Sequence, residues 1–154
     1  MDNPLKIIWL MASARRPSRV GRMKAVKEGF WLGRNYAAAM FFGRILTHTQ
    51  EEADRINADG GGSLERHETI HLLQARSTCD SWVVYYLLYI WYYLRALPQN
   101  RYMRNAAYLL NPFEMEAYEH MYDDSYPERC SKGANGWRRY AKMKPKERRR
   151  ISNS

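Results

Sequence analysis

The chain has few cysteines and few histidines. Its 154 residues include two cysteines, Cys79 and Cys130, and four histidines. Two cysteines are too few for the disulfide framework of a small secreted scaffold, so we expect a reduced compartment, the cytoplasm. The scarcity of histidine makes its spacing informative, because two of the four stand only four positions apart, at His67 and His71.

A hydrophobic run long enough to cross a membrane is also lacking. The aromatic segment 81–94 carries no charge, but Asp80 and Arg95 limit it to fourteen residues, whereas a spanning helix needs about 20. We therefore expect a core helix there, with contact to a membrane surface as the alternative. The apolar run KIIWLM at 6–11 is shorter than a signal-peptide core of about 7–15 residues. It predicts a short buried strand.

Acidic residues are scarce at both ends of the chain. The net charge of +9 is the sum of +5 over 1–24, +7 over 137–154 and −3 over 25–136. Basic ends around a near-neutral body suit solvated tails or contact with an anionic membrane surface. Nucleic acid is not expected as a partner, because no nucleic-acid-binding fold motif accompanies the terminal arginines.

The remaining composition predicts one folded domain. Hydrophobic residues make up 45% of the chain and aromatic residues 14%, which is enough to build a core. We predict an α+β, mostly helical fold with a short sheet, made of a single domain over 1–136 and a basic C-terminal tail over 137–154, in which a short anchoring turn precedes disorder. The residue patterns predict helices at 49–62, 63–78, 81–94 and 111–124. The apolar stretch 36–46 is strand-like at its FF end, which makes 40–46 the candidate strand, although its alanines leave a helix possible.

The stretch HETIHLLQ at 67–74 carries the pattern HExxH. On a helix this spacing places His67 and His71 on one side of a single turn, where two imidazole nitrogens can bind one zinc ion. Glu68 lies about 100° further around the helix. From there its carboxylate can act as general base toward a metal-bound water. Gln74, one turn beyond His71, could hydrogen-bond a ligand or be an ordinary polar helix residue.

A catalytic zinc ion needs a third protein ligand. The helix at 111–124 offers Glu114, Glu116, Glu119 and His120. Glu114 and Glu116 are two positions apart, about 200° around a helix, so both cannot face one metal. Each also has an ordinary interpretation, Glu114 as the end of a capping box opened by Asn111 and Glu116 as a solvent-facing charge. The residues alone leave this choice open.

HETIHLLQ followed by NPFEMEAY at 111–118 resembles the gluzincin-type zinc metallopeptidases over 36–140. More closely, the two motifs are similar to those of small, uncharacterised bacterial metallopeptidases with HExIHxxQ and a later FExEAY segment. The resemblance implies a minimal zincin-like domain in which His67, His71 and Glu114 hold Zn²⁺, with Glu116 as the alternative third ligand. Tyr118 stands where that family has an acidic or amide residue. The resemblance also implies that the 40–46 strand lines the cleft and pairs with an extended peptide, with an ordinary core strand as the alternative.

Two classes of function follow from these patterns. The first is a zinc-dependent metallopeptidase, a hydrolase in which Glu68 activates water toward a peptide or protein substrate. There Tyr122, Tyr126 or His120 could stabilise the oxyanion. The second is a non-catalytic module that keeps the metal for structure and contacts a membrane surface or a protein partner through 81–94 and the basic ends.

Overall fold

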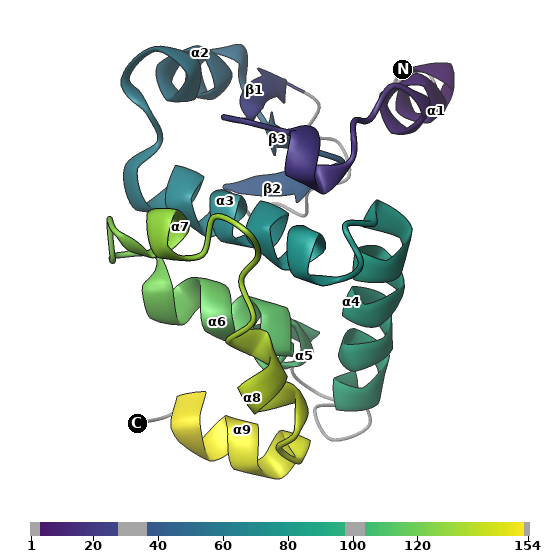
Figure 1. The fold of residues 1–154 in the computed structure, drawn as a ribbon, viewed down its shortest axis with the longest axis vertical. Helices are drawn as coiled ribbons and strands as arrows, with labels where there is room; N and C mark the ends of the chain where they lie inside the picture. Colours follow the sequence, from purple (N-terminus) through teal and green to yellow (C-terminus); the bar gives the residue numbers. More distant parts are fainter. Residues whose placement is uncertain (1–3, 28–36, 98–103, 153–154) are drawn as a thin grey trace.

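The computed structural model describes residues 4–27, 37–97 and 104–152. It is mostly helical with one small sheet (Figure 1), which confirms the predicted α+β, mostly helical class. The helices are α1 (Pro4–Ala12), α2 (Gln50–Asp59), α3 (Gly62–Ser77), α4 (Trp82–Ala96), α5 (Arg104–Leu109), α6 (Pro112–His120), α7 (Tyr126–Arg129), α8 (Trp137–Ala141) and α9 (Pro145–Ser152), with a 3-10 turn η1 (Pro17–Arg19) after α1.

The sheet has three strands in the order β1-β3-β2. They are β1 (Lys24–Lys27), β2 (Ala38–Phe41) and β3 (Arg44–Thr47). The central strand β3 runs parallel to β1 and antiparallel to β2. Strand β2 therefore lies at an edge of the sheet, next to α3 (Figure 1).

A two-residue turn joins β2 and β3. The strands pair directly on either side of Phe42 and Gly43, whose φ angles are 47° and 82°. Such a turn needs left-handed backbone at both positions, which Asn and Gly adopt more readily than Phe. Phe42 is held there by α4, since its N–H donates to the Tyr86 hydroxyl at 3.1 Å and the two rings lie 4.9 Å apart. The prediction of one continuous strand at 40–46 was therefore wrong.

Helix α2 packs beside β1 and β3, and helix α3 packs beside β2 (Figure 1). Helix α2 begins with a capping box, in which the Thr49 side chain accepts from the N–H of Glu52 and the Glu52 side chain accepts from the N–H of Thr49. It ends at Gly60, whose φ of 84° suits glycine. The helix predicted within 49–62 is thus confirmed.

Helix α3 is the central helix of the molecule. On one side Leu72 and Ala75 belong to a core cluster with the sheet, α4 and α6. On the other side Ile70 and Leu73 pack with Ala117 and residues of the 126–134 segment. A helix that is enclosed on both sides must bury its polar residues as well as its apolar ones. The polar residues of the 67–74 motif therefore need partners inside the protein.

The segment 6–11 is helical rather than extended, so the buried strand predicted there was wrong. It lies in α1, where Ile8 and Trp9 are exposed and Leu10 is buried. A short apolar run fits a strand and a helix equally well, and flanking residues must decide between them. Here Pro4 stands at the first helical position, where its fixed φ favours a helix start.

The aromatic segment 81–94 forms α4, as predicted. Ser81 caps it by accepting a hydrogen bond from the N–H of Val84. Trp82 and Tyr85 are buried against the core, whereas a second face of the helix is exposed. Among the helices that the structure describes, none combines the length and the apolar character needed to cross a bilayer.

Disorder was expected after a short anchoring turn in the tail 137–154, and this was wrong as far as residue 152, because the tail forms α8 and α9. Helix α8 buries Trp137, whose ring centroid lies 4.7 Å from that of Phe113 on α6. Helix α9 buries Arg148, whose guanidinium donates to the carbonyl of Leu110 at 2.7 Å. Both helices continue the packing of the domain below α6 (Figure 1).

Candidate metal centre

Helix α3 places the two motif histidines side by side. His67 and His71 are one turn apart and buried, with 4% and 5% of their surfaces exposed. Their Nε2 atoms lie 3.1 Å apart, and the ring planes are nearly perpendicular, at 84°. The helical spacing therefore brings two ring nitrogens to one buried point, as the sequence predicted.

Glu114 joins them from the first turn of α6. Its Oε2 atom lies 3.1 Å from Nε2 of His67, and its Oε1 atom lies 3.3 Å from Nε2 of His71. Helix α6 is capped by Asn111, whose side-chain oxygen accepts from the N–H of Phe113. Glu114 thus faces the histidines of α3 instead of closing a capping box.

These separations fit the ligand shell of a metal ion. Around a tetrahedral zinc ion with bonds of about 2.0–2.1 Å, neighbouring ligand atoms lie about 3.3 Å apart. Here the two Nε2 atoms are 3.1 Å apart, and each has a Glu114 oxygen nearby, Oε2 at 3.1 Å from His67 and Oε1 at 3.3 Å from His71. Within residues 4–27, 37–97 and 104–152, His67, His71 and Glu114 are the one group of three such donors close enough to share an ion. Two imidazoles and one carboxylate are also a donor set that zinc accepts.

Gln74 fixes the protonation pattern of His71. The amide nitrogen of Gln74 donates to the carbonyl of Phe113 at 2.9 Å and to Oε2 of Glu116 at 2.7 Å. Because both partners are acceptors, the amide oxygen must be the atom that faces Nδ1 of His71, at 2.8 Å. Nδ1 therefore carries the proton, and neutral His71 keeps a lone pair on Nε2. That lone pair points toward His67 and Glu114, where a metal ligand needs it.

Glu116 is not one of the three donors; it hydrogen-bonds to residues that position them. Besides Gln74, its carboxylate accepts from the Tyr126 hydroxyl and from the N–H of Gly136, each at 2.6 Å. The residue is fully buried, so its interpretation as a solvent-facing charge is wrong. Glu116 joins α6 to α3 and to the start of α8, and it holds Gln74 in the orientation that His71 requires.

The charges of the group stabilise one another. Burial opposes ionisation of Glu114, but the adjacent His71 and His67 lower the pKa of its carboxyl far below the usual value of 4.5. Burial likewise opposes protonation of His71. The effect of the Glu114 carboxylate is larger than that of burial, so the pKa of His71 is raised to about 9. In the metal-free protein the added proton on His71 thus supplies the positive charge that a bound cation would supply at the same point.

Glu68 lies beside this group with one oxygen free of partners. The residue is buried, with 3% of its surface exposed, and the backbone N–H of Met40 on β2 hydrogen-bonds to its carboxyl. No described group donates to its Oε2 atom, which is also buried. Burial raises the pKa of this carboxyl, partly offset by His71 and His67. An unpartnered buried carboxylate next to three metal donors is typical of a site that handles protons.

The outer edge of β2 is already occupied at two positions. The backbone N–H of Met40 bonds to Glu68, and its carbonyl accepts from the Tyr86 hydroxyl at 3.2 Å. The N–H of Phe42 donates to the same hydroxyl. Pairing of an extended peptide along this edge requires these bonds to be replaced, so the structure favours an ordinary core strand over the peptide-binding strand that the resemblance implies.

Tyrosines surround Glu114 and were missed in the sequence. The Tyr89 hydroxyl donates to Oε1 of Glu114 at 2.6 Å, and the Tyr108 side chain bonds to both Glu114 and Tyr118. The ring of Tyr118 packs edge-on against His67, with centroids 4.6 Å apart, and 43% of the residue is exposed. Tyr118 thus links the buried donors to solvent. In the sequence Tyr118 stood out only as a departure from the family pattern, and among twelve tyrosines nothing singled out Tyr89 or Tyr108.

The other candidates from the sequence have different partners. The Glu119 carboxylate accepts from the Arg139 guanidinium at 2.9 Å. The ring of His120 stacks on Tyr126 with centroids 3.8 Å apart. Tyr126 itself donates to Glu116, and Tyr122 is 78% exposed. The structure brings none of these four residues into the His67–His71–Glu114 group.

Comparison with known proteins adds no relative. No protein-family model, curated protein or solved structure matches this chain. The relationship to the gluzincins accordingly stays a prediction that rests on the motifs at 67–74 and 111–118.

Proposed function

We propose that the protein is a zinc-dependent metallopeptidase, with His67, His71 and Glu114 as metal ligands and Glu68 as the general base. The observation that carries the proposal is the convergence of three donor side chains, whose ring nitrogens and two carboxylate oxygens lie 3.1 to 3.3 Å from one another in pairs, beside a buried carboxyl that lacks a partner on one oxygen. A zinc ion held there supplies Lewis acidity and makes a bound water acidic near neutral pH.

The role of Glu68 is to move a proton. Its Oε2 atom has no competing donor among the described residues, so it can accept a proton from the attacking water. The raised pKa of this carboxyl makes the protonated form accessible, and the proton can then pass to the nitrogen of the leaving amine. His71 stays in the correct tautomer throughout because Gln74 holds its Nδ1 proton.

A second candidate is a metal site that serves stability alone. The burial of all four residues favours it, since His67, Glu68, His71 and Glu114 are each no more than 5% exposed. In this reading the ion joins α3 to α6 and no substrate reaches it. The unpartnered oxygen of Glu68 favours the peptidase, because a purely structural site has no use for a buried carboxylate without partners.

Replacing Glu68 with Gln separates the two candidates. Purified wild-type protein, Glu68→Gln and His67→Ala are assayed for zinc by mass spectrometry and for cleavage of casein and of a fluorescence-quenched peptide mixture. Glu51→Gln, an exposed carboxylate on α2, is the matched control. The peptidase proposal expects cleavage by the wild type and by Glu51→Gln, zinc without cleavage in Glu68→Gln, and neither in His67→Ala. Equal zinc in wild type and Glu68→Gln with no cleavage by the wild type supports the structural site.

A further inference from the structure

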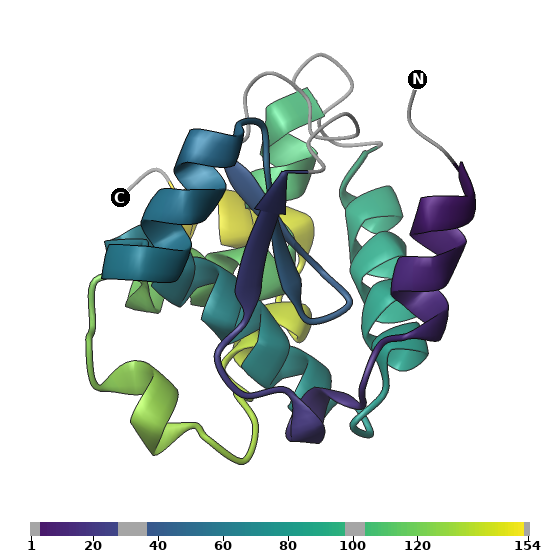
Figure 2. The same ribbon diagram turned by 90° about the horizontal axis from the view of Figure 1, so that it is seen from above.

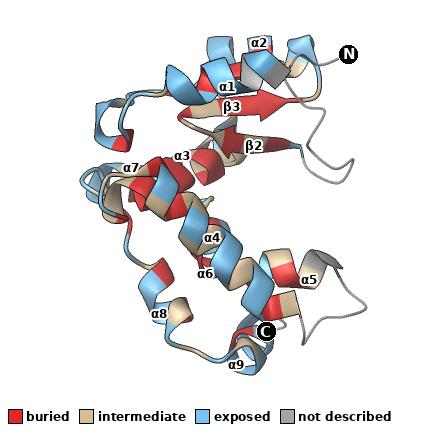
Figure 3. Cartoon of the chain, turned by 90° about the vertical axis from the view of Figure 1, so that its right-hand side faces the viewer, coloured by how far each residue is buried: buried red, intermediate tan, exposed pale blue. Residues whose placement is uncertain are grey.

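Helix α4 leaves an apolar stripe exposed. Its members are Val83, Leu87, Ile90, Trp91 and Leu94. They are between 52% and 64% exposed, and their spacing of three and four residues puts them on one face of the helix. Figure 3 views the molecule from the side that carries α4, and exposed residues of this helix face the viewer. Single exposed apolar residues are common on protein surfaces, but five large ones in one stripe form a continuous apolar patch.

Helix α1 adds a second exposed apolar face on the same side. Leu5, Ile8 and Trp9 follow helical spacing and are 68%, 61% and 61% exposed. Figures 1 and 2 both show α1 and α4 at the same side of the molecule. The segment that follows α1 is bound to the start of α4, since the indole N–H of Trp82 donates to the carbonyl of Arg15 at 2.8 Å. We call the exposed apolar residues of the two helices the α1–α4 surface.

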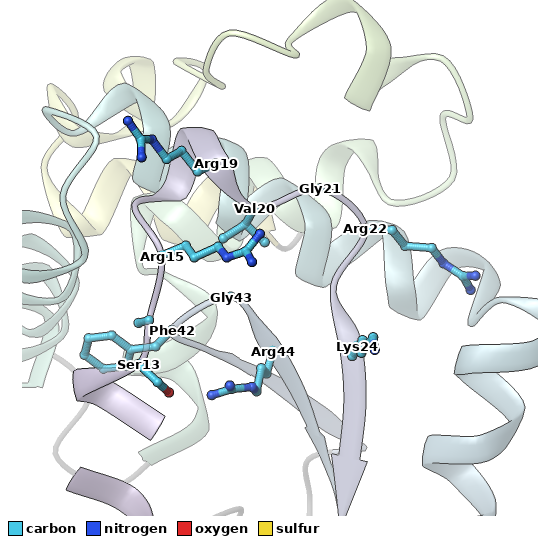
Figure 4. A pocket seen from close by; sticks show the side chains of 11 residues that line it. Ser13, Arg15, Arg19, Val20, Gly21, Arg22, Lys24, Phe42, Gly43 and Arg44 are labelled. Atoms are coloured by element: carbon cyan, nitrogen blue, oxygen red, sulfur yellow. The ribbon is translucent and has the colours of Figure 1, made fainter. Parts of the chain in front are cut away.

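Cations gather beside the α1–α4 surface. A cavity of about 210 Å³ opens between the end of α1, the η1 turn and the β2–β3 turn. Its charged lining residues are Arg15, Arg19, Arg22, Lys24 and Arg44, and none of the described residues that line it is acidic (Figure 4). Of these cations, Arg22 already pairs with Glu65 at 2.8 Å. The other four cations are available to attract an anion.

Arg44 connects the cavity to the apolar surface. Its guanidinium lies over the ring of Trp9, 5.6 Å from the centroid, while its Nη1 atom is buried and bonds to no described group. At the other end of the surface the Arg95 guanidinium lies 5.8 Å from the ring centroid of Trp91. Apolar side chains thus stand directly beside arginines, with tryptophan at the boundary. This arrangement is typical of helices that lie at the interface between lipid headgroups and acyl chains.

We propose that the α1–α4 surface docks on a membrane that contains anionic phospholipids, and that the arginine cavity holds a lipid phosphate. The apolar stripes enter the boundary between headgroups and acyl chains, while Arg15 and Arg44 bind the phosphate oxygens. Neither α1 nor α4 contains an acidic residue that an anionic lipid would repel. Docking is independent of the proposed peptidase activity, and it brings any activity of the metal centre to a membrane surface.

Vesicle binding tests the proposal. The full chain is sedimented with vesicles of phosphatidylcholine alone and with vesicles that also contain phosphatidylglycerol. We expect binding to the anionic vesicles, weakened by added salt because salt screens the attraction between arginines and phosphates. Trp9 and Trp91 should report entry into the lipid as a blue shift of tryptophan emission, which Trp9→Phe combined with Trp91→Phe should reduce.

Two pairs of matched variants locate the contact. Leu87→Gln combined with Trp91→Gln should lower the partition coefficient by about tenfold or more, whereas Leu109→Gln combined with Tyr122→Gln, two exposed apolar residues outside the surface, should leave it unchanged. Arg15→Gln combined with Arg44→Gln should weaken the preference for anionic vesicles. Lys142→Gln combined with Lys146→Gln removes the same charge from the α8–α9 region and should not.

The remaining outcomes overturn the proposal. Absence of vesicle binding does so, as does equal loss of binding in the surface variants and in their controls. Light scattering can reveal a third such outcome. The wild type forms a concentration-dependent dimer, Leu87→Gln combined with Trp91→Gln abolishes the dimer, and neither the wild type nor this variant binds vesicles. In that case the surface is an interface between two copies of the chain.

Discussion

The amide oxygen of Gln74 lies 2.8 Å from Nδ1 of His71, and the amide nitrogen of the same side chain lies 2.7 Å from Oε2 of Glu116. A chain of hydrogen bonds therefore runs from the buried Glu116 carboxylate of α6 through Gln74 to His71, a ligand of the proposed metal centre. Such outer contacts orient ligand histidines and strengthen their bonds to the metal. They explain why the chain carries a glutamine three residues after the second histidine and a second acid two residues after Glu114.

Replacing Gln74 with Leu should weaken zinc binding by about 10–100-fold, because Nδ1 of His71 loses the acceptor that fixes its tautomer. The zinc dissociation constant can be measured by competition with a chromophoric chelator. Gln50→Leu, which removes an exposed glutamine on α2, is the control. An unchanged dissociation constant for Gln74→Leu contradicts the orienting role.

Glu114→Gln and Glu116→Gln should have different effects. The first should abolish stoichiometric zinc binding, because it removes the anionic ligand between the two imidazoles. The second should retain zinc and lower the free energy of unfolding by about 1–3 kcal/mol, since an amide cannot accept all the bonds from Gln74, Tyr126 and Gly136. Zinc content and denaturant unfolding separate the two. Zinc loss in Glu116→Gln with zinc retained in Glu114→Gln reverses the assignment.

Zinc binding should release about one proton at neutral pH. Burial opposes the charge on His71, but Glu114 raises the pKa of this histidine to about 9, so metal-free protein at pH 7 carries a proton that a metal ligand must lose. Affinity should therefore rise by about tenfold per pH unit from pH 7 and level off near pH 9. Calorimetry in buffers with different heats of ionisation counts the protons, and a count of zero contradicts the prediction.

The stability of the metal-free protein should be greatest between pH 4.5 and 6.5. The pKa of Glu114 is lowered from 4.5, so its contribution is present above pH 4.5 and is lost as the pH falls further. The pKa of His71 is raised from 6.5 to about 9, so its contribution is complete below pH 6.5 and is lost as the pH rises through 9. Thermal melting in the presence of a chelator measures this profile. Glu114→Gln should flatten it, because both shifts depend on that carboxylate.

Gly136→Ala should destabilise the protein by about 1–3 kcal/mol. A Cβ atom at this position would lie 2.6 Å from Oε1 of Glu116, which the backbone N–H of Gly136 also contacts. Gly21→Ala is the matched control, because nothing lies within 4 Å of a Cβ atom at that position. Denaturant unfolding compares the two. Equal stability of both variants contradicts a tight contact between Gly136 and Glu116.

The two histidines of the proposed metal centre could be predicted from the sequence because helical spacing alone brings His67 and His71 together. The residues alone could not select the third donor, since Glu114 and Glu116 differ only in how α6 packs on α3; the resemblance implied Glu114, which the structure places beside the histidines. The position of Gln74 on the helix could be predicted, but its partner could not, because the contact to Glu116 joins residues 42 positions apart. The buried Trp137 and Arg148 were hidden by the many cations around them, which made 137–152 look disordered. Residues 6–11 were too few for periodicity to distinguish helix from strand.

Anomalous diffraction at the zinc absorption edge, from crystals of the purified protein, tests the central claim most directly. The account predicts one peak about 2 Å from Nε2 of His67, Nε2 of His71 and a carboxylate oxygen of Glu114, with Glu68 beside it and not bonded to it. A peak elsewhere, or zinc-supplemented crystals without a peak between α3 and α6, would contradict it.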